Sequence, residues 1–514
     1  MSASYTSNGV VAANSIQVTI VDVSQPNPKL SHFGKVSSFE GTSTCLKCHM
    51  TEAAEVHASV HYQWKGDTRD VLNAPEPSMG KIGGINDFCI YPDIHWIGKL
   101  TNTRGESVDG GCAKCHAGLG AKPAAQASPA EFENIDCLIC HSSDYKRTVE
   151  MSPEGGRFVP DTSKMNVSVL EAAQNITLPS RQTCLNCHAY AGGGDNYKRG
   201  DIEAMHADPS FGLDVHMAAT EAGGAGLNCT DCHITENHRI AGRGSDLRPN
   251  ESDIRVSCAN CHSPTPHSES NLDRHTQRVD CSVCHIPAFA RSTPTDMDRH
   301  WESPGELHIE RGLYEPARDM QSNVVPVYRF FNGKSHFYNF GEPAVADPET
   351  GWILMSGPDG DVTDPASKIH AFKLHKATQP MDLATDRLLP LKIGIFFSTG
   401  NVQAAIEAGA EAVEWGYSGH RWADTERYMG IFHEVAPKEQ ALECSDCHEN
   451  GNRMDFAALG YTPKQFRGGD PLCASCHEDE SDEWSGVEYF YKVHNKHVKD
   501  KKLDCSNCHT FSER

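Results

Sequence analysis

The stretch Cys137-Leu138-Ile139-Cys140-His141 has the pattern Cys-x-x-Cys-His, and the chain of 514 residues repeats this pattern ten times. In such a motif two thiols can add to the vinyl groups of one porphyrin, and the adjacent histidine can bind the iron. Structural zinc also uses Cys and His, but a zinc site needs a second ligand pair and no histidine directly after each second cysteine. The tenfold repeat therefore predicts ten c-type haems. The expected haem-attaching cysteines are Cys45, Cys48, Cys112, Cys115, Cys137, Cys140, Cys184, Cys187, Cys229, Cys232, Cys258, Cys261, Cys281, Cys284, Cys444, Cys447, Cys473, Cys476, Cys505 and Cys508.

The histidine that ends each motif is the expected proximal ligand of its iron. The motifs use all but one of the 21 cysteines, which leaves Cys89 and no framework of disulfides. Of 28 histidines, 18 lie outside the motifs, and methionine is scarcer at 13. We therefore expect mostly bis-histidine haems, which have lower potentials than His/Met haems. The proximal set is His49, His116, His141, His188, His233, His262, His285, His448, His477 and His509.

Distal ligands should be histidines outside the motifs on well-ordered segments. His57 and His61 are four residues apart, as on one face of a helix. Eleven candidates compete for nine or ten places, so at least one of them is expected to be wrong. They are His57, His61, His206, His216, His238, His267, His275, His375, His433, His494 and His497. We expect ordinary surface or core roles for His32, His95, His300, His308, His336, His370 and His420.

The net charge of −23 argues against binding to nucleic acid or to anionic membrane surfaces. No apolar run reaches 18 residues, so we expect no membrane span. Haem c is attached outside the cytoplasm, and the chain starts without a recognisable signal peptide. We therefore expect a mature, extracytoplasmic protein, with an extracellular or cell-surface location favoured over the periplasm.

The composition predicts a fold in which porphyrins supply much of the core. Hydrophobic residues make up 38% and the mean hydropathy is −0.50. We expect a mostly irregular and α-helical multihaem fold, with short helices and long loops around stacked haems and little β structure. Three parts are expected. Residues 1–41 form an N-terminal extension with an edge strand at Ile16–Val23. Residues 42–471 form the core, which includes a haem-free scaffold at 286–443 with a helix around Gln403–Trp415. Residues 472–514 form a C-terminal extension with two further haems.

Several stretches of the chain resemble a known family. They include Asn86-Asp87-Phe88-Cys89-Ile90, Gly192-Gly193-Gly194-Asp195 and Arg453-Met454-Asp455-Phe456. In these the chain is similar to the octahaem tetrathionate reductase-like multihaem cytochromes. The resemblance covers roughly residues 42–471 and eight motifs. The motifs at Cys473 and Cys505 lie beyond it.

The resemblance implies a catalytic second haem, the one attached at Cys112 and Cys115. In that family a lysine replaces the distal histidine and a cysteine approaches the same pocket. By the resemblance, Cys89 matches the cysteine and Lys146 the lysine, with Lys164 as the fallback. The plainer alternatives are a small buried apolar side chain for Cys89 and a surface or propionate-pairing charge for Lys146.

Two functions remain open from the sequence, and they are compatible. The favoured one is electron transfer outside the cytoplasm to redox partners or extracellular acceptors. An edge strand and a terminal haem would allow head-to-tail association into a filament. The alternative is reduction of tetrathionate, nitrite, hydroxylamine or a similar small oxidant at a lysine-ligated haem. The distal ligand of the second haem would separate the two functions.

Overall fold

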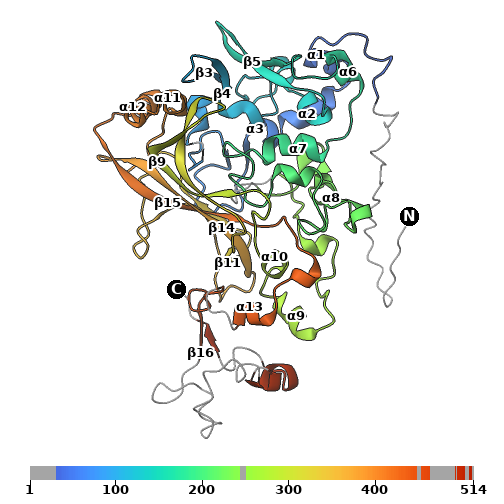
Figure 1. Ribbon diagram of the computed structural model, residues 1–514, viewed down its shortest axis with the longest axis vertical. Helices are drawn as coiled ribbons and strands as arrows, with labels where there is room; N and C mark the ends of the chain where they lie inside the picture. Colours follow the sequence, from blue (N-terminus) through green and yellow to red (C-terminus); the bar gives the residue numbers. More distant parts are fainter. Residues whose placement is uncertain are drawn as a thin grey trace.

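The computed structural model describes residues 31–88, 90–243, 251–448, 453–463, 492–493, 495–503 and 509–511. The motif-rich part before residue 286 and the sheet that follows it lie side by side (Figure 1). No helix within these ranges is long and apolar enough to cross a membrane. The strand expected at residues 16–23 lies outside the described residues.

Helices before residue 286 are short, as expected, and the longest of them, α2 and α7, have eight residues. Several motifs form one helical turn, because the spacing of Cys-x-x-Cys-His places the first cysteine, the second cysteine and the histidine on one helix face. The helices are α1 (Thr42–Leu46), α2 (Met50–His57), α3 (Val60–Gln63), α4 (Pro129–Glu133), α5 (Leu138–His141), α6 (Val169–Gln174), α7 (Arg181–His188), α8 (Cys229–Cys232), α9 (Ser270–His275) and α10 (Cys281–His285). Turns of 3-10 helix add η1 (Pro92–His95), η2 (Cys112–Cys115), η3 (Ala204–Ala207) and η5 (Cys258–Asn260).

Four small hairpins connect these helices. Their short antiparallel strands fix the loops between consecutive motifs. The hairpins are β1 (Lys65–Asp67) with β2 (Ser78–Gly80), β3 (Gly98–Thr101) with β4 (Ser107–Gly110), β5 (Arg147–Ser152) with β6 (Gly155–Pro160), and β7 (Thr235–Glu236) with β8 (Arg239–Ile240).

The expectation of little β structure is wrong for the haem-free segment, which forms a seven-stranded mixed sheet. Its order is β10-β9-β14-β15-β13-β12, and β11 also pairs with β14. The sequence did not indicate this sheet because basic side chains interrupt the apolar pattern of its central strand. Lys373 and His375 occupy buried positions of β14. The strands are β9 (Thr295–His308), β10 (Leu313–Gln321), β11 (Val327–Phe331), β12 (Ser335–Phe337), β13 (Ile353–Pro358), β14 (Lys368–Asp382) and β15 (His420–Gly430).

A conventional apolar core supports this sheet. Helices α11 (Ile393–Thr399) and α12 (Val402–Ala412) pack on it, and Trp301 is completely buried among Leu388, Phe396 and Ile406. The helix expected around Gln403–Trp415 is confirmed, although it ends at Ala412. Asn401 caps its start by accepting a hydrogen bond from the backbone amide of Ala404 at 3.0 Å.

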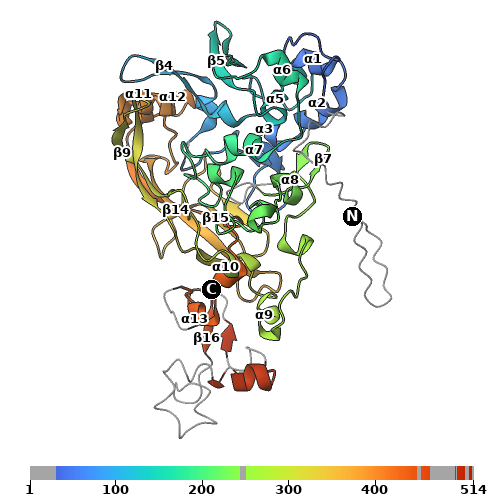
Figure 2. The same cartoon turned by 45° about the vertical axis from the view of Figure 1, so that its right-hand side comes forward.

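The C-terminal part projects from one end of the molecule (Figure 2). After helix α13 (Cys444–His448), strand β16 (Tyr461–Pro463) pairs with β17 (His509–Phe511) in an antiparallel ladder. A π-helical turn at Asn495–Asp500 lies close to α9, where Arg274 donates to the Val498 carbonyl at 3.4 Å. Most of the expected C-terminal extension, including its four motif cysteines, lies outside the described residues.

Candidate haem-binding site

The first eight motifs line one continuous cavity of about 4470 Å³. A site for one drug-sized ligand takes about 300–1,000 Å³, so this space can hold several large groups. Each of the eight motifs contributes at least one cysteine to the wall, and most of the surface of the cavity is apolar. Thiols at the edges of an apolar space are what covalently attached porphyrins require, so the residues present fit the expected haems.

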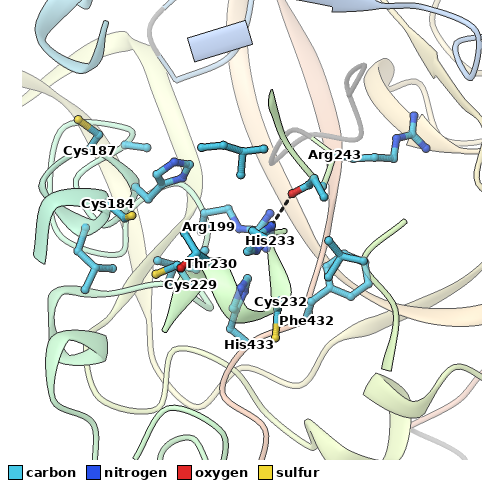
Figure 3. A pocket seen from close by; sticks show the side chains of 18 of the residues that line it. Cys184, Cys187, Arg199, Cys229, Thr230, Cys232, His233, Arg243, Phe432 and His433 are labelled. Carbon is cyan, nitrogen blue, oxygen red and sulfur yellow. Dashed lines mark hydrogen bonds between the residues drawn. The ribbon is translucent and has the colours of Figure 1, made fainter. Parts of the chain in front are cut away.

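The fifth motif shows how the chain orients two imidazoles toward one metal (Figure 3). His233 uses Nδ1 to contact the Ala241 carbonyl at 2.8 Å, and His433 uses Nδ1 to contact Asp201 at 3.1 Å. Both rings therefore keep Nε2 available, and their centroids are 6.2 Å apart with an interplanar angle of 21°. Two imidazoles with metal–nitrogen bonds of about 2.0–2.1 Å, as for zinc, and ring radii of roughly 1.1 Å would have centroids about 6.3 Å apart. The space between these two histidines fits one iron.

The same spacing recurs at four other motifs. Three of the opposing histidines, His61, His216 and His267, are sequence candidates, and so is His433 at the fifth motif. The fourth, His32, was expected to be an ordinary histidine, and nothing in its sequence setting distinguishes it. The pairs are His61 with His188 at 6.2 Å, His216 with His262 at 5.9 Å, His267 with His285 at 6.2 Å, and His32 with His49 at 5.9 Å.

His238 lies near the third motif. Burial lowers the pKa of His141, and positive charge on His238 lowers it further. His141 keeps Nδ1 on the Thr177 carbonyl at 2.9 Å, and His238 keeps Nδ1 on Glu55 at 2.7 Å. Both rings thus hold Nδ1 in a hydrogen bond, as in the fifth motif.

Two candidates occupy settings that do not face a motif histidine. His57 ends α2 and its Nε2 contacts the Ala124 carbonyl at 3.0 Å, whereas His61 belongs to the separate helix α3. The prediction of one helix face for His57 and His61 is therefore wrong, because the chain turns at Ala58 and Ser59. His375 is completely buried in β14 beside Asp87, 2.5 Å from its carboxylate.

The remaining candidates lie in other settings. His206 is buried in η3, where its Nδ1 accepts from the Glu203 amide at 3.2 Å. His275 ends α9, and His497 lies in the π-helical turn with Nδ1 3.0 Å from the Val493 carbonyl. His494 lies outside the described residues.

Thiols from different motifs meet in the cavity, and these contacts order the motifs in space. The fourth motif is a junction, since its thiols contact those of the second and fifth motifs and lie near a thiol of the third. From there the order continues to the sixth, seventh and eighth motifs, while the first joins the third. Hydrogen-bonding contacts join Cys45 to Cys137, Cys115 to Cys187, Cys184 to Cys229 and Cys258 to Cys281. Electrostatic effects on pKa indicate that Cys140 is near Cys184 and Cys187, Cys232 near Cys261 and Cys284 near Cys447.

The second motif differs from the others. His116 is fully buried, its Nε2 is 2.5 Å from the Tyr62 carbonyl, and burial lowers its pKa to about 4. Its ring neighbours are Tyr62, Trp64 and Trp96. Within the described part of the chain, no histidine ring faces His116.

Basic side chains gather around this motif in an otherwise acidic protein. Burial and the nearby charge of Arg311 lower the pKa of Lys114. The neighbouring Cys187 thiol, together with Lys81 and other cations, lowers the pKa of Cys115 to about 6. Lys198, Arg299, Arg311 and Arg318 also line the cavity.

The residues implied by the family resemblance are only partly brought together. Cys89 lies outside the described residues. Lys146 is half-buried and donates to the Ser143 carbonyl at 3.1 Å, and Lys164 is exposed and pairs with Asp161 at 2.8 Å. Neither lysine is among the residues that line the cavity.

The repeated motifs, the shared cavity and the facing imidazoles define the class, and the chain is a multihaem c-type cytochrome. Its fold is similar to that of an octahaem cytochrome c from Shewanella oneidensis, with a TM-score of 0.64 and 29% identity over 83% of this chain and 93% of that one. Residues 315–451 match a family described as cytochrome c bacterial, and residues 209–295 match cytochrome c7 and related cytochrome c. An uncharacterised protein of Archaeoglobus fulgidus is 29% identical over 252 residues, which are 42% of this chain and 81% of that protein.

Proposed function

We propose that the protein transfers electrons along one branched row of haems outside the cytoplasm. The observation that carries this proposal is the order of thiol contacts, from the first motif through the third and fourth to the eighth. Bound haem supplies an iron that cycles between the ferric and ferrous states. Because each thiol fixes a porphyrin edge, a contact such as Cys184 with Cys229 brings the edges of two neighbouring macrocycles together.

Histidine ligation supports a low-potential row. A hydrogen bond from Nδ1 of a ligating imidazole to a carbonyl or carboxylate fixes the ring and makes the ligand more basic. His233 with Ala241, His433 with Asp201 and His267 with Asp273 have this arrangement. More basic ligands stabilise the ferric state, so these pairs favour low potentials.

Removal of the junction tests the conduction proposal. The variant Cys184→Ala/Cys187→Ala should lose one haem by intact mass. Among the first eight motifs it should separate three groups, namely the second motif alone, the first with the third, and the fifth to eighth. Stopped-flow reduction should then show three independent populations of these haems where the intact protein shows one. The matched control is Cys444→Ala/Cys447→Ala, which removes the eighth motif of the same row but leaves the junction. Equal reduction kinetics in the two variants would rule out a junction at the fourth motif.

We also propose head-to-tail self-association that extends the row between subunits, with redox partners or extracellular acceptors at its ends. The support is in the sequence, namely the apolar alternation of Ile16, Val18 and Ile20 and the two motifs beyond residue 471. Deletion of residues 1–24 should leave the haem content unchanged and abolish long assemblies in electron micrographs. A full-length protein that stays monomeric at high concentration by light scattering would refute this proposal.

The proposed location outside the cytoplasm has its own test. Cell fractionation would separate an extracellular from a periplasmic location.

A second candidate function, reduction of a small oxyanion, has one specific observation in its favour. The second motif lacks a facing histidine among the described residues and has Lys81, Lys114, Arg147 and Arg311 as charged neighbours. An anion such as tetrathionate would be attracted there, and two electrons would cleave its central S–S bond to give two thiosulfate ions. The plainer reading is that these cations pair with haem propionates.

The variant Cys89→Ala tests the reductase proposal. It should lower turnover of tetrathionate or nitrite while intact mass shows unchanged haem loading. A Lys146→Met variant should change the spectrum of one haem if Lys146 is its distal ligand. Absence of turnover by the intact protein with any small oxyanion would refute the proposal.

A further inference from the structure

Four basic side chains of the large sheet reach two loops that form the cavity wall. We propose that Lys373, His375, Arg427 and Arg299 are positioning residues that hold this wall beside the second motif. The inference rests on the proposal that the second haem is the reactive one, and the experiment below separates the two. It also gives a role to His375, which the sequence predicted as a distal ligand.

Lys373 binds the first loop, which contains Gly192, Tyr197 and Lys198. Its amine is completely buried and donates to the carbonyls of Tyr197 and Lys198 at 2.9 and 3.1 Å and to Thr295 Oγ1 at 2.6 Å. An ammonium group has three donors, and all three have partners here. The loop is therefore fixed at the residue whose side chain lines the cavity.

His375 binds the second loop, which contains Asn86, Asp87 and Phe88. His375 lies two residues after Lys373 in β14, so the two side chains are on the same face of the strand. Its Nδ1 contacts Asp87 at 2.5 Å, and its ring stacks on Phe88 with centroids 4.0 Å apart. Arg427, its cross-strand partner in β15, donates to the other carboxylate oxygen of Asp87 at 2.5 Å. Both oxygens of one buried carboxylate are thus held by adjacent strands.

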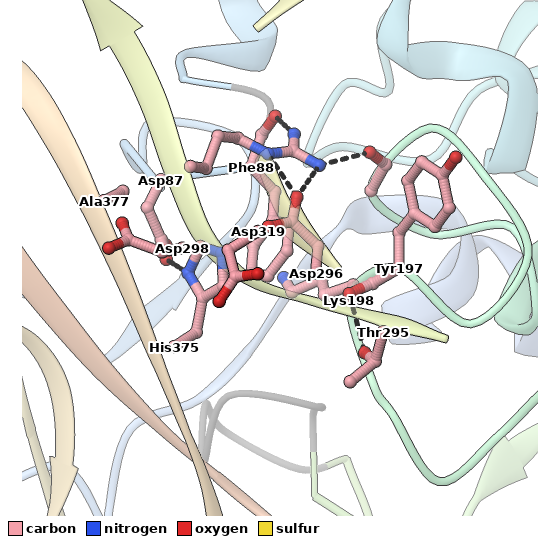
Figure 4. Close-up of polar contacts among 12 residues, drawn as sticks. Asp87, Phe88, Tyr197, Lys198, Thr295, Asp296, Asp298, Asp319, His375 and Ala377 are labelled. Carbon is pink, nitrogen blue, oxygen red and sulfur yellow. Dashed lines mark hydrogen bonds and ion pairs between the residues drawn. The ribbon is translucent and has the colours of Figure 1, made fainter. Parts of the chain in front are cut away.

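Arg299 of the neighbouring strand β9 contacts both loops, next to Asp296 and Phe88, which Figure 4 labels. Its guanidinium donates to the Phe88 carbonyl at 2.6 Å and to the Gly192 carbonyl at 2.9 Å. Asp296 orients it through Nε at 2.7 Å. One planar side chain with a fixed donor fork therefore sets the distance between the two loops.

The loops held in this way lie beside the second motif. Asn86, Phe88 and Gly192 line the cavity. The residues that flank the second loop, Ile85 and Ile90, belong to the apolar cluster against which Cys112 packs. Displacement of the loop would therefore move the surroundings of the porphyrin attached at Cys112.

The choice of ions over apolar contacts has a physical reason. A buried ion pair stabilises a fold no better than well-packed apolar side chains, because desolvation offsets the attraction. It does, however, specify a single arrangement of its partners. Charged side chains from three strands hold the two irregular loops in one geometry. Apolar contacts alone would not fix the loops in a single position.

The test uses His375→Gln and Lys373→Met in the haem-loaded protein. We expect unchanged haem loading by intact mass, a shifted potential for one haem with the other redox transitions unchanged, and an increase in KM for tetrathionate of several-fold. The control is His300→Gln on β9, because His300 is half-exposed and pairs with Glu302 at 3.1 Å away from the loops. It should change neither quantity.

Should His375→Gln fail to fold, Asp87→Asn weakens the same contact between His375 and Asp87 from the side of the loop. Unchanged potentials in all variants, or equal shifts of every haem, would overturn the inference. A shift confined to one haem in a protein without oxyanion turnover would support the positioning role and refute the reductase proposal.

Discussion

Two regions of the molecule fill their interiors differently. They are the motif-rich part at residues 31–285 and the sheet region at 286–443. The main apolar cluster has 15 buried residues, including Trp301, and all of them except Ile85 and Ile90 belong to the sheet region. The clusters confined to the motif-rich part have between three and five buried residues and surround the cavity. One region buries its own side chains, whereas the other needs porphyrins to complete its interior. The contrast predicts how each region responds to loss of its core.

The largest effect should follow from preventing haem attachment. A chain expressed without haem ligation should lose amide protection throughout residues 31–285 because the cavity has nothing to fill it. Residues 295–430 should keep protection, since their core is made of side chains. Hydrogen exchange with mass spectrometry measures both regions in one sample. Equal loss of protection in both would contradict the contrast.

Next in size is damage to the core of the sheet. Trp301→Ala should lower the free energy of unfolding of this region by about 3–5 kcal/mol, as for large-to-small changes in cores. Chemical denaturation followed by hydrogen exchange would measure it. Trp352→Ala is the control, since Trp352 is only half-buried and should cost less. A similar cost for the two would argue against a core centred on Trp301.

The ionic link between the regions should give a comparable or smaller effect that depends on pH. Burial alone would raise the pKa of Asp87, but Arg427 and His375 hold it well below its ordinary value. The stabilisation is therefore present above the unfolded pKa of about 3.9 and is lost as the pH falls through the lower folded value. Asp87→Asn should cost about 3–5 kcal/mol at neutral pH, and the difference from the unmodified protein should shrink only in acid. A difference that is constant from pH 7 to pH 2 would exclude this link.

The smallest effect is expected at a helix end. Asn401→Ala removes the cap of α12 and should cost about 1 kcal/mol, measured by denaturation. Asn401→Asp restores an acceptor and should recover most of the loss. An unchanged stability in Asn401→Ala would mean that packing alone holds the helix.

Local spacing made the attachment motifs predictable from the sequence. Five consecutive residues contain the whole chemical requirement, so Cys137 to His141 can be interpreted without any tertiary information. The pairing of His433 with His233 depends on a contact across 200 residues, and the sequence could only nominate His433 as a candidate. His32 lacked even a motif-like setting, although its ring lies 5.9 Å from that of His49.

The sheet was missed because of the residues on its inward face. Lys373, His375 and Gln379 are completely buried in β14, so the usual alternation of apolar and polar side chains is inverted at these positions. Asp87 and Asp296 compensate the two basic groups from other segments, and no local pattern predicts such pairings. His375 was interpreted as a metal ligand because it is a histidine of the haem-free segment, and the sequence does not show that Asp87 and Asp296 pair with it.

The ladder between β16 and β17 has a consequence for how the chain could gain or lose haems. It pins both ends of the 45 residues from 464 to 508, which include the ninth motif and most of the tenth. The entropy of closing a flexible segment between two fixed points grows slowly, by about 0.6 kcal/mol for each doubling of its length. A cassette inserted at this site would be tethered at two points next to the eighth motif and would place little thermodynamic burden on the rest of the fold. The row could thus be lengthened by insertion without redesign of the domain that carries it.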